Sequence, residues 1–271
     1  MNIHFASFEP NRTGGGWTQG RYLVDHFGQA EYEKSDIYFI MSASMVQRDA
    51  VQKAKQDGKK IVLRVDNAIR NSRNRNTGMT RLYDYAQWSD LVIYQSEWAR
   101  RFLVPFLKKD GEVILNGVDT NLYNPTSRAE SSEDTYLYAR SSRDEGKNWI
   151  SAWYWYVEQH AKNPDSKLEI AGKFSHENLE YNFDFYNGEQ YRFVGEQPNL
   201  VDCFKRNKYF LYSFVNDACS NTLLEARASG CEIIDVYGAL GTGGAPEIMQ
   251  LEDLSIELCM EEYESCLARI D

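Results

Sequence analysis

Short apolar runs alternate with amphipathic segments along the first half of the chain. Five apolar runs predict strands, at 2–7, 37–42, 59–67, 90–95 and 112–119. The segments between them carry apolar residues at helical spacing and predict four helices, at 21–27, 45–58, 80–90 and 96–106. Gly58 suits a left-handed end for the second helix, and Ser96 suits the N-cap of the fourth. This alternation predicts a parallel sheet with helices packed on its faces.

A polar segment at 121–135 lacks apolar periodicity, and the alternation of strands and helices begins again after it. The second half contains a long helical segment at 147–161 and five further expected strands, at 135–141, 167–173, 191–196, 208–214 and 231–237. We therefore predict an α/β protein with two Rossmann-like domains, 1–117 and 118–271, that face a central cleft. In such folds ligands bind beyond the carboxyl ends of the strands. The last helix of the chain is expected to pack back on the first domain.

The composition supports a folded protein of two such domains. The 271 residues are 42% hydrophobic and 14% aromatic, which is enough to bury a core in each domain. No window reaches the roughly 18 apolar residues of a membrane span, and the first residues lack the pattern of an export signal. The five cysteines form no Cys-x-x-Cys pair and have no histidine partner at metal-binding spacing. We expect a cytoplasmic protein with reduced thiols, no integral membrane segment, no metal and no cofactor.

The net charge of −10 conceals a basic region. Residues 59–109 contain eleven Lys or Arg against four Asp or Glu, whereas 247–271 holds eight acidic residues and a single base. A basic region within an acidic protein suggests an anionic partner at one face. The alternative is a solvated surface whose charge is balanced by the acidic neighbouring segment.

Two carboxylates with seven residues between them stand in the stretch DACSNTLLEARASGC, 217–231. The strand expected at 208–214 places Asp217 in a loop, and Glu225 then lies about one turn into the helix that follows. The small residues between them let backbone amides approach a ligand closely, and amides at a helix N-terminus bind anions. This order of groups suits a nucleoside diphosphate sugar. The plainer interpretation is that both acids stabilise the helix dipole.

This stretch, together with GTGGAPEI at 241–248, resembles the acidic signature of the retaining glycosyltransferases of family 4, which have the GT-B fold. Three further segments lie where that family has its own motifs: NGVDTNLYNP at 116–125, RSSRDEGKNW at 140–149 and the glycine loop at 14–16. The matches follow the family's order and cover nearly the whole chain, which resembles a short form of it. The resemblance implies transfer of a hexosyl or pentosyl group from a nucleotide-diphosphate sugar to an acceptor hydroxyl, with retention and without metal.

The resemblance also implies roles for individual residues. Asp217 and Lys147 belong to the implied catalytic group, in which Asp217 holds the sugar and Lys147 contacts the diphosphate together with Arg140 or Arg143. Fixed cations there stabilise the charge that develops on the leaving diphosphate. The other implied donor contacts are Glu225 with the ribose, backbone amides of Asn221 and Thr222 with the phosphates, and Gly15 and Gly16 where the first domain approaches the phosphates.

Two departures from the family pattern bear on the sugar. The family's first carboxylate is usually Glu, and Asp217 is one methylene shorter. The glycine-rich turn that normally follows this carboxylate is replaced by ACSN, 218–221. Both changes leave the identity of the donor sugar open.

The acceptor is expected against the first domain, where the basic excess lies. The predicted acceptor-binding residues, which stand among asparagines in a loop with almost no apolar content, are Arg70, Arg73 and Arg75. They suit an anionic acceptor, such as a glycan, a lipid-linked phosphate or modified DNA. Further arginines that could extend this group are Arg64, Arg81, Arg100 and Arg101. Asp66, at the carboxyl end of the third strand, is the candidate catalytic group on this side, and a helix or loop cap is its alternative role.

The segment WARRFLVPFLKK, 98–109, mixes basic and apolar residues. This pattern fits an interfacial helix on a membrane surface and equally a helix that faces the core. We favour the core-facing helix, so peripheral membrane attachment is the alternative.

Two other classes of function compete with glycosyl transfer. A nucleotide-sugar or nucleic-acid binding protein of the same fold, without turnover, is the main alternative, which the Asp217 departure and the short chain allow. A nicotinamide-dependent oxidoreductase is disfavoured, because no strand is followed by G-x-G-x-x-G with an acidic residue about 20 positions further on. The run GGGW at 14–17 lacks that glycine spacing.

Overall fold

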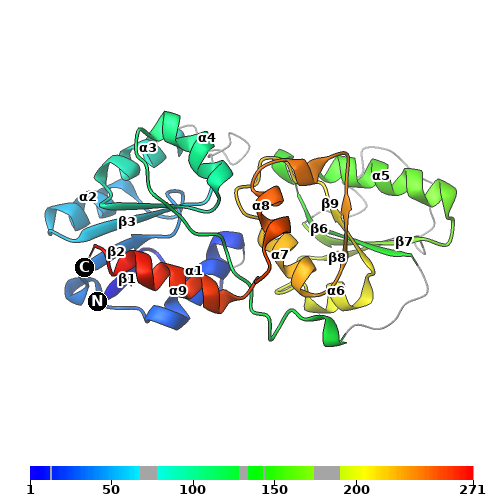
Figure 1. Cartoon of the computed structure of the whole chain (residues 1–271), viewed down its shortest axis with the longest axis horizontal. Coiled ribbons are helices and arrows are strands. Elements are labelled where there is room, and N and C mark those ends of the chain that lie inside the picture. Colours follow the sequence, from blue (N-terminus) through cyan, green and yellow to red (C-terminus); the bar gives the residue numbers. More distant parts are fainter. Residues whose placement is uncertain (13, 68–77, 128–133, 143, 174–189, 271) are drawn as a thin grey trace. The chain divides into compact units, whose positions relative to one another are not determined.

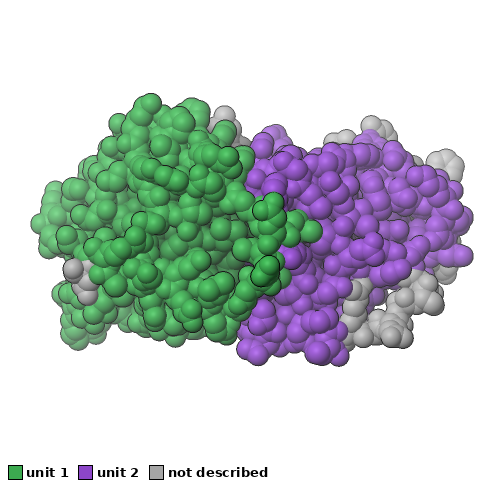
Figure 2. All heavy atoms as spheres, viewed as in Figure 1, with its two compact units in different colours: residues 1–117, 218–220, 247–271 green, residues 118–217, 221–246 purple. Residues whose placement is uncertain are grey.

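The computed structural model describes residues 1–12, 14–67, 78–127, 134–142, 144–173 and 190–270. The chain divides into two compact units, shown in Figure 2. Unit 1 comprises 1–117, 218–220 and 247–271, and unit 2 comprises 118–217 and 221–246. Each unit is built around its own parallel five-stranded sheet, so the prediction of two Rossmann-like α/β domains is confirmed.

Unit 1 contains a parallel sheet whose strand order is the chain order, β1-β2-β3-β4-β5 (Figure 1). The strands are β1 Ile3–Phe5, β2 Ile37–Ile40, β3 Lys60–Val65, β4 Leu91–Tyr94 and β5 Glu112–Val113. The helical elements are α1 Gly15–Phe27, η1 Tyr32–Lys34, α2 Arg48–Gln56, α3 Gly78–Trp88, α4 Glu97–Leu107 and α9 Ile256–Leu267, while α8 Ala245–Gln250 begins in unit 2 and ends in unit 1.

The core of unit 1 lies on both faces of this sheet. On one face, residues of β1 and β2 pack with Leu23 of α1 and Tyr263 of α9. On the other face, residues of β2, β3 and β4 pack with α2, α3 and α4, for example Val51, Leu82 and Leu103. Strands buried on both faces are rich in apolar residues on both sides, which is why these segments read as nearly continuous apolar runs.

Unit 2 contains a parallel sheet with the order β10-β9-β6-β7-β8. The strands are β6 Thr135–Ser141, β7 Lys167–Gly172, β8 Tyr191–Gly195, β9 Tyr209–Tyr212 and β10 Glu232–Asp235. The helical elements are η3 Pro125–Ser127, η4 Glu145–Lys147, α5 Trp149–Lys162, α6 Val201–Arg206, α7 Asn221–Ala228 and η6 Ala239–Gly241. The first strand, β6, is therefore central, with β7 and β8 on one side and β9 and β10 on the other.

Two features of the backbone correct the expectations from sequence. The first helix begins at Gly15 rather than near residue 21, because Gly14 with a φ of 127° ends the preceding loop. The fifth strand stops at Val113 rather than at residue 119. Ile114 still donates its N–H to the Tyr94 carbonyl at 2.9 Å, and the chain then leaves the sheet.

Two expected helix ends are confirmed. The Ser96 hydroxyl accepts a hydrogen bond from the Ala99 N–H at 3.1 Å and caps the start of α4. Gly58 follows α2 with a φ of 76°, which a residue with a Cβ adopts only at a cost in strain. The five cysteines are free and buried, as expected for reduced thiols. Among the described residues, no helix is both long enough and apolar enough to cross a membrane.

Asn116 holds the segment that follows β5 within unit 1. Its side-chain NH₂ donates to Gln95 Oε1 at 3.1 Å and to the Cys219 carbonyl at 3.3 Å. Its side-chain oxygen accepts a hydrogen bond of 2.6 Å from Arg64. These side-chain hydrogen bonds attach the segment after β5 to Gln95, Arg64 and Cys219.

Candidate functional site

The candidate site lies in unit 2, where the order of the strands reverses. The chain moves from β6 outward through β7 and β8, and it then returns to add β9 and β10 on the other side of β6. In open parallel sheets such a switch point leaves an opening beyond the carboxyl ends of the two central strands, and ligands bind there. The segments that follow β6 and β9 carry the charged residues singled out in the sequence.

Lys147 and Asp217 form an ion pair in unit 2, with Lys147 Nζ 2.5 Å from Asp217 Oδ2. Both side chains are largely shielded, with 21% and 16% of their surface exposed. The ammonium group also lies 4.3 Å from the ring centroid of Phe214, a cation–π contact. The carboxylate and the aromatic ring together hold the Lys147 charge in one place.

The backbone of Lys147 is held from the opposite side. Its carbonyl accepts hydrogen bonds from the Tyr138 hydroxyl at 2.9 Å and from the Ser213 hydroxyl at 3.1 Å. Burial raises the pKa of Tyr138, so this hydroxyl stays protonated and remains a donor. Lys147 therefore has a fixed main chain as well as a fixed charge.

A short 3₁₀ helix, η4, brings Lys147 to this position. Asp144 starts η4 by accepting the Gly146 N–H at 3.1 Å, and Asn148 ends it in the left-handed conformation with a φ of 48°. The Gly146 carbonyl accepts the Val215 N–H at 3.0 Å, which ties η4 to the segment after β9. The sequence motif EGKN thus folds into a turn that is anchored to the segment carrying Asp217.

Asp217 is anchored by the glycine turn at 241–244. Its carbonyl accepts the Gly244 N–H at 2.8 Å. A Cβ on Gly243 would lie 2.3 Å from that carbonyl oxygen, and the φ of Gly243 is 62°. Both the space and the backbone conformation therefore require glycine at position 243. The motif GTGGAPEI is visible in the sequence, but this role of its glycine is not, because the contact joins residues far apart in the chain.

Arg140 lies at a bulge near the carboxyl end of β6. The register between β6 and β7 shifts between Ala139 and Ser141, and Arg140 itself has a φ of 79°. Such bulges redirect a side chain, and strained backbone in non-glycine residues is concentrated at functional sites. The Arg140 Nε–H donates to Thr222 Oγ1 at 3.4 Å, which places this guanidinium at the start of α7.

The space for this bulge is provided by β7. Gly172 has a φ of 146°, and a Cβ at this position would lie 2.4 Å from the Ser141 backbone nitrogen. Glycine at position 172 therefore permits the local geometry that orients Arg140.

Glu225 lies about one turn into α7, as predicted, and its side chain is buried. Burial raises the pKa of Glu225 to about 7, and the nearby Arg140 guanidinium partly opposes that shift. Asn221 and Thr222 form the first turn of the same helix and are also buried. Carboxylates with strongly perturbed pKa values cluster at functional sites, which makes Glu225 a candidate site residue.

Unit 2 thus contains the part of the predicted site that the structure brings together, Arg140, Lys147, Asp217, Asn221, Thr222 and Glu225. Three other predicted residues are in unit 1, where Gly15 and Gly16 form the first turn of α1 and Asp66 directly follows β3. Four predicted arginines lie outside the described residues, Arg70, Arg73, Arg75 and Arg143.

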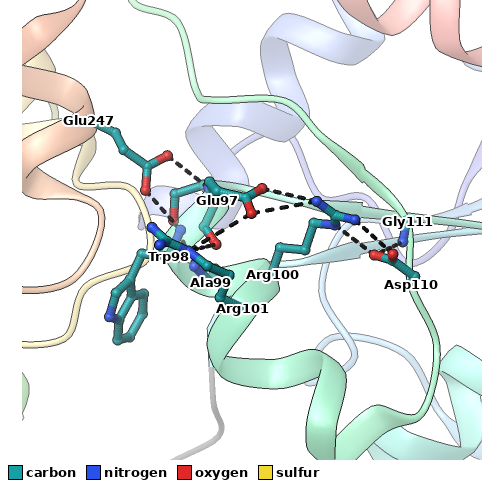
Figure 3. A network of polar contacts seen from close by, with 9 residues as sticks. Glu97, Trp98, Ala99, Arg100, Arg101, Asp110, Gly111 and Glu247 are labelled. Atoms are coloured by element: carbon teal, nitrogen blue, oxygen red, sulfur yellow. Dashed lines mark hydrogen bonds and ion pairs between the residues drawn. The ribbon is translucent and has the colours of Figure 1, made fainter.

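Two arginines named as possible extensions of an acceptor surface have their guanidinium groups engaged within unit 1, and the burial of Arg64 rules it out for that role. Arg64 is only 1% exposed and bonds to the Met41 carbonyl and to Asn116 inside unit 1. Arg100 lies between two carboxylates, Glu97 and Asp110, as Figure 3 shows. Both guanidinium groups are therefore engaged within unit 1.

No protein-family model matches the sequence, and no curated protein matches it. Solved structures do match over most of the chain. Sucrose-phosphate synthase from Thermosynechococcus elongatus is 14% identical, with a TM-score of 0.65 over 93% of this chain and 76% of that chain. HepE from Anabaena, in complex with UDP, is 13% identical, with a TM-score of 0.67 over 100% of this chain and 91% of that one.

A third match is the pneumococcal O-GlcNAc transferase GtfA, in complex with UDP and GlcNAc. It is 14% identical, with a TM-score of 0.58 over 80% of this chain and 44% of that chain. Identities this low establish the fold alone. The chain therefore has the GT-B fold, with two Rossmann-like domains that each contain a parallel sheet of five strands.

Proposed function

We propose that the protein transfers a sugar from a nucleotide-diphosphate sugar to an acceptor hydroxyl and that unit 2 binds the donor. The observation that carries this proposal is the group of opposite charges at the switch point of unit 2. Lys147 and Arg140 supply cations, Asp217 and Glu225 supply carboxylates, and Arg140 contacts Thr222 at the start of α7. A sugar nucleotide needs both sets of groups, cations for its diphosphate and carboxylates for its hydroxyls.

The cations act on the diphosphate in this proposal. A diphosphate leaving group gains negative charge as its bond to the sugar breaks, and fixed cations stabilise that charge more strongly in the transition state than in the ground state. Lys147 is well suited because its position is fixed by Asp217, Phe214 and the two hydroxyls on its carbonyl. The amides of Asn221 and Thr222 at the start of α7 add hydrogen-bond donors for phosphate oxygens.

The carboxylates act on hydroxyl groups. Asp217 accepts hydrogen bonds from the sugar, and Glu225 accepts them from the ribose. Hydrogen bonds from two ribose hydroxyls stabilise the charged form of Glu225, so donor binding lowers its pKa from about 7. Binding is therefore expected to release a proton from this residue near neutral pH.

We propose uridine as the base of the donor. HepE has been solved in complex with UDP and with UDP and glucose, and the pneumococcal transferase GtfA with UDP and GlcNAc. The resemblance to retaining glycosyltransferases of family 4 supports retention, independence from metal and transfer of a hexosyl or pentosyl group. A cytoplasmic location is consistent with five free, buried thiols.

Unit 1 is proposed to bind the acceptor. Gly15 and Gly16 in the first turn of α1 and Asp66 after β3 remain its candidate contacts to the reacting groups. An anionic acceptor that Arg70, Arg73 and Arg75 bind is proposed from the sequence alone. A binding protein of the same fold without turnover is the competing function.

A thermal-shift screen against UDP, GDP, ADP and their glucose conjugates tests the donor proposal. A ligand at 100 times its Kd stabilises the folded protein by about 2.7 kcal/mol, so a clear rise in Tm with UDP is expected. No rise with any of these nucleotides would contradict it. Release of UDP from UDP-sugars, measured with and without candidate acceptors, then separates an enzyme from a binding protein.

A further inference from the structure

Helix α4 carries two rows of apolar residues, about 100° apart around the helix axis. On the inner face, Ala99, Leu103 and Leu107 are fully buried against the core of unit 1. The prediction of a core-facing helix is therefore confirmed for this face. The outer face carries a second row of apolar side chains, which the core does not use.

This outer row consists of Trp98, Phe102 and Phe106, spaced one helical turn apart. The rings of Trp98 and Phe102 are stacked, with centroids 5.1 Å apart and an interplanar angle of 8°, and the next pair of centroids is 6.1 Å apart. Phe102 is 44% exposed and Phe106 is 61% exposed. Exposed aromatic rings that line up along one face of a helix mark an interaction surface.

Basic side chains border the aromatic row. Arg101 is 72% exposed, although its Nε–H also donates to the Glu97 carbonyl at 3.4 Å and lies 3.8 Å from the Glu97 carboxylate. Lys108 and Lys109 follow the last turn, and in the part of the chain that the structure describes neither ammonium group has an ion-pair partner. Arg100 points elsewhere, toward Glu97 and Asp110 (Figure 3). The uncompensated charge of this helix is therefore positive.

The start of α4 is held firmly, which fixes the direction of the outer face. The carboxylate of Glu247 accepts the Glu97 N–H at 2.7 Å and the Trp98 N–H at 2.8 Å, as Figure 3 shows. Ser96 accepts the N–H of Ala99 at 3.1 Å. Donors at a helix start that are satisfied in this way stabilise the helix, so the aromatic row is presented on a stable element.

We propose that the outer face of α4 binds the surface of an anionic phospholipid bilayer. Tryptophan favours the boundary between headgroups and acyl chains, and phenylalanine favours the region just below it. Lysine and arginine beside an apolar row gain further from negative headgroups, at about fivefold in affinity for each charge. The match of basic residues to an anionic surface favours a bilayer as the occupant.

Co-sedimentation with vesicles of phosphatidylcholine, with and without phosphatidylglycerol, tests this proposal. The protein should sediment with the anionic vesicles and much less with the neutral ones, and added salt should weaken the binding. A Phe102→Ser and Phe106→Ser double variant should lose about tenfold or more in affinity. A Lys108→Gln and Lys109→Gln double variant should lose its preference for the anionic lipid.

A matched control removes exposed aromatic rings from unit 2. Tyr154 is 37% exposed and Tyr237 is 58% exposed, and a Tyr154→Ser and Tyr237→Ser double variant should bind anionic vesicles as the unchanged protein does. Thermal melts of all variants check that each is folded. A Phe106→Glu single variant, at the most exposed ring of the row, should also sediment less with anionic vesicles than the unchanged protein does.

The depth of binding can be read at a single position. Because the five native cysteines are buried, a Phe106→Cys variant can be labelled selectively with an environment-sensitive fluorophore. Its emission should shift to the blue on adding anionic vesicles, whereas a label at Tyr154→Cys should not shift.

The proposal is overturned if the unchanged protein stays in the supernatant when anionic vesicles are sedimented. It is equally overturned if the Phe102→Ser and Phe106→Ser double variant sediments with these vesicles to the same extent as the unchanged protein. It is also overturned if sedimentation velocity shows that this variant converts a dimer into a monomer, because the face then belongs to a second copy. The donor proposal is tested without lipid by the nucleotide screen, so the failure of one proposal is distinguishable from the failure of the other.

Discussion

Lys147 Nζ lies 2.5 Å from Asp217 Oδ2 in unit 2, although 70 positions separate the two residues in the sequence. In this state each proposed donor-binding charge neutralises the other. Under the proposed function, binding of a nucleotide sugar exchanges these partners, so that Lys147 turns to the diphosphate and Asp217 to a sugar hydroxyl. The ion pair holds the Lys147 ammonium group in position before the donor arrives.

Lys147→Ala is expected to lower kcat/KM for sugar transfer by about 10²–10³-fold, the usual effect of removing one preorganised group that stabilises developing charge. The fold should persist, because the main-chain carbonyl of residue 147 still accepts hydrogen bonds from the hydroxyls of Tyr138 and Ser213. Steady-state kinetics and a thermal melt measure both effects. Lys173→Ala is the control, since this lysine is 69% exposed in the same unit. Undiminished turnover in Lys147→Ala would remove this residue from the site.

Asp217→Asn is expected to separate binding of the nucleotide from binding of the sugar. Without the carboxylate, Lys147 is available to the diphosphate, so UDP should bind about fivefold more tightly. Turnover of a UDP-sugar should fall, because the contact from Asp217 to the sugar is weakened. Titration calorimetry with UDP and with UDP-sugars measures the two affinities. Asp217→Glu keeps the charge and should leave UDP affinity nearly unchanged. If Asp217→Asn bound UDP with the same affinity as the unchanged protein, the exchange of partners would be contradicted.

Glu225 predicts a pH dependence of stability. Its pKa is raised from an ordinary value of 4.5 to about 7 in the folded state, so between these values the folded protein holds a proton that the unfolded chain has lost. The free energy of unfolding should therefore fall as pH rises through this window. Glu225→Gln should flatten the dependence of the free energy of unfolding on pH. Above about pH 8 this variant should be more stable than the unchanged protein by on the order of 3 kcal/mol.

Calorimetric melts across this pH range measure the Glu225 effect. The control is Glu232→Gln on β10, whose side chain is exposed and which should leave the pH profile unchanged. Glu225→Gln should also bind UDP more weakly if this carboxylate holds the ribose. A parallel pH profile in Glu225→Gln and in the unchanged protein would show that the group does not titrate in this window.

Gly243→Ala is expected to disturb the position of Asp217. The added Cβ would lie 2.3 Å from the Asp217 carbonyl oxygen, at a residue with a φ of 62°, so we expect a loss of about 1–3 kcal/mol in stability. Affinity for UDP-sugars should fall with it. Gly241→Ala is a matched control in the same turn, because a Cβ there has no atom within 4 Å. If Gly243→Ala and Gly241→Ala had similar melting temperatures and similar affinities for UDP-sugars, the role of Gly243 in positioning Asp217 would be contradicted.

Local sequence determined much of the fold. Continuous apolar runs predicted the buried parallel strands, and β6 was expected at the residues where it is found, 135–141. Ser96 and Gly58 marked two helix ends correctly. Asp217 in a loop and Glu225 one turn into a helix were also predicted. These features depend on neighbours within a few residues, so their physical causes are written in the local pattern.

Tertiary structure alone decided which groups meet. Three contacts join segments that belong to or follow different strands. They are the Lys147–Asp217 ion pair, the close approach of Gly243 to Asp217, and the hydrogen bond from Arg140 at the bulge to Thr222. Likewise, only the packing revealed that Arg64 is buried and that α4 exposes a second apolar face. Hydrophobic periodicity reports which face of an element is buried. It does not report the order of strands in a sheet, and that order brings distant side chains together.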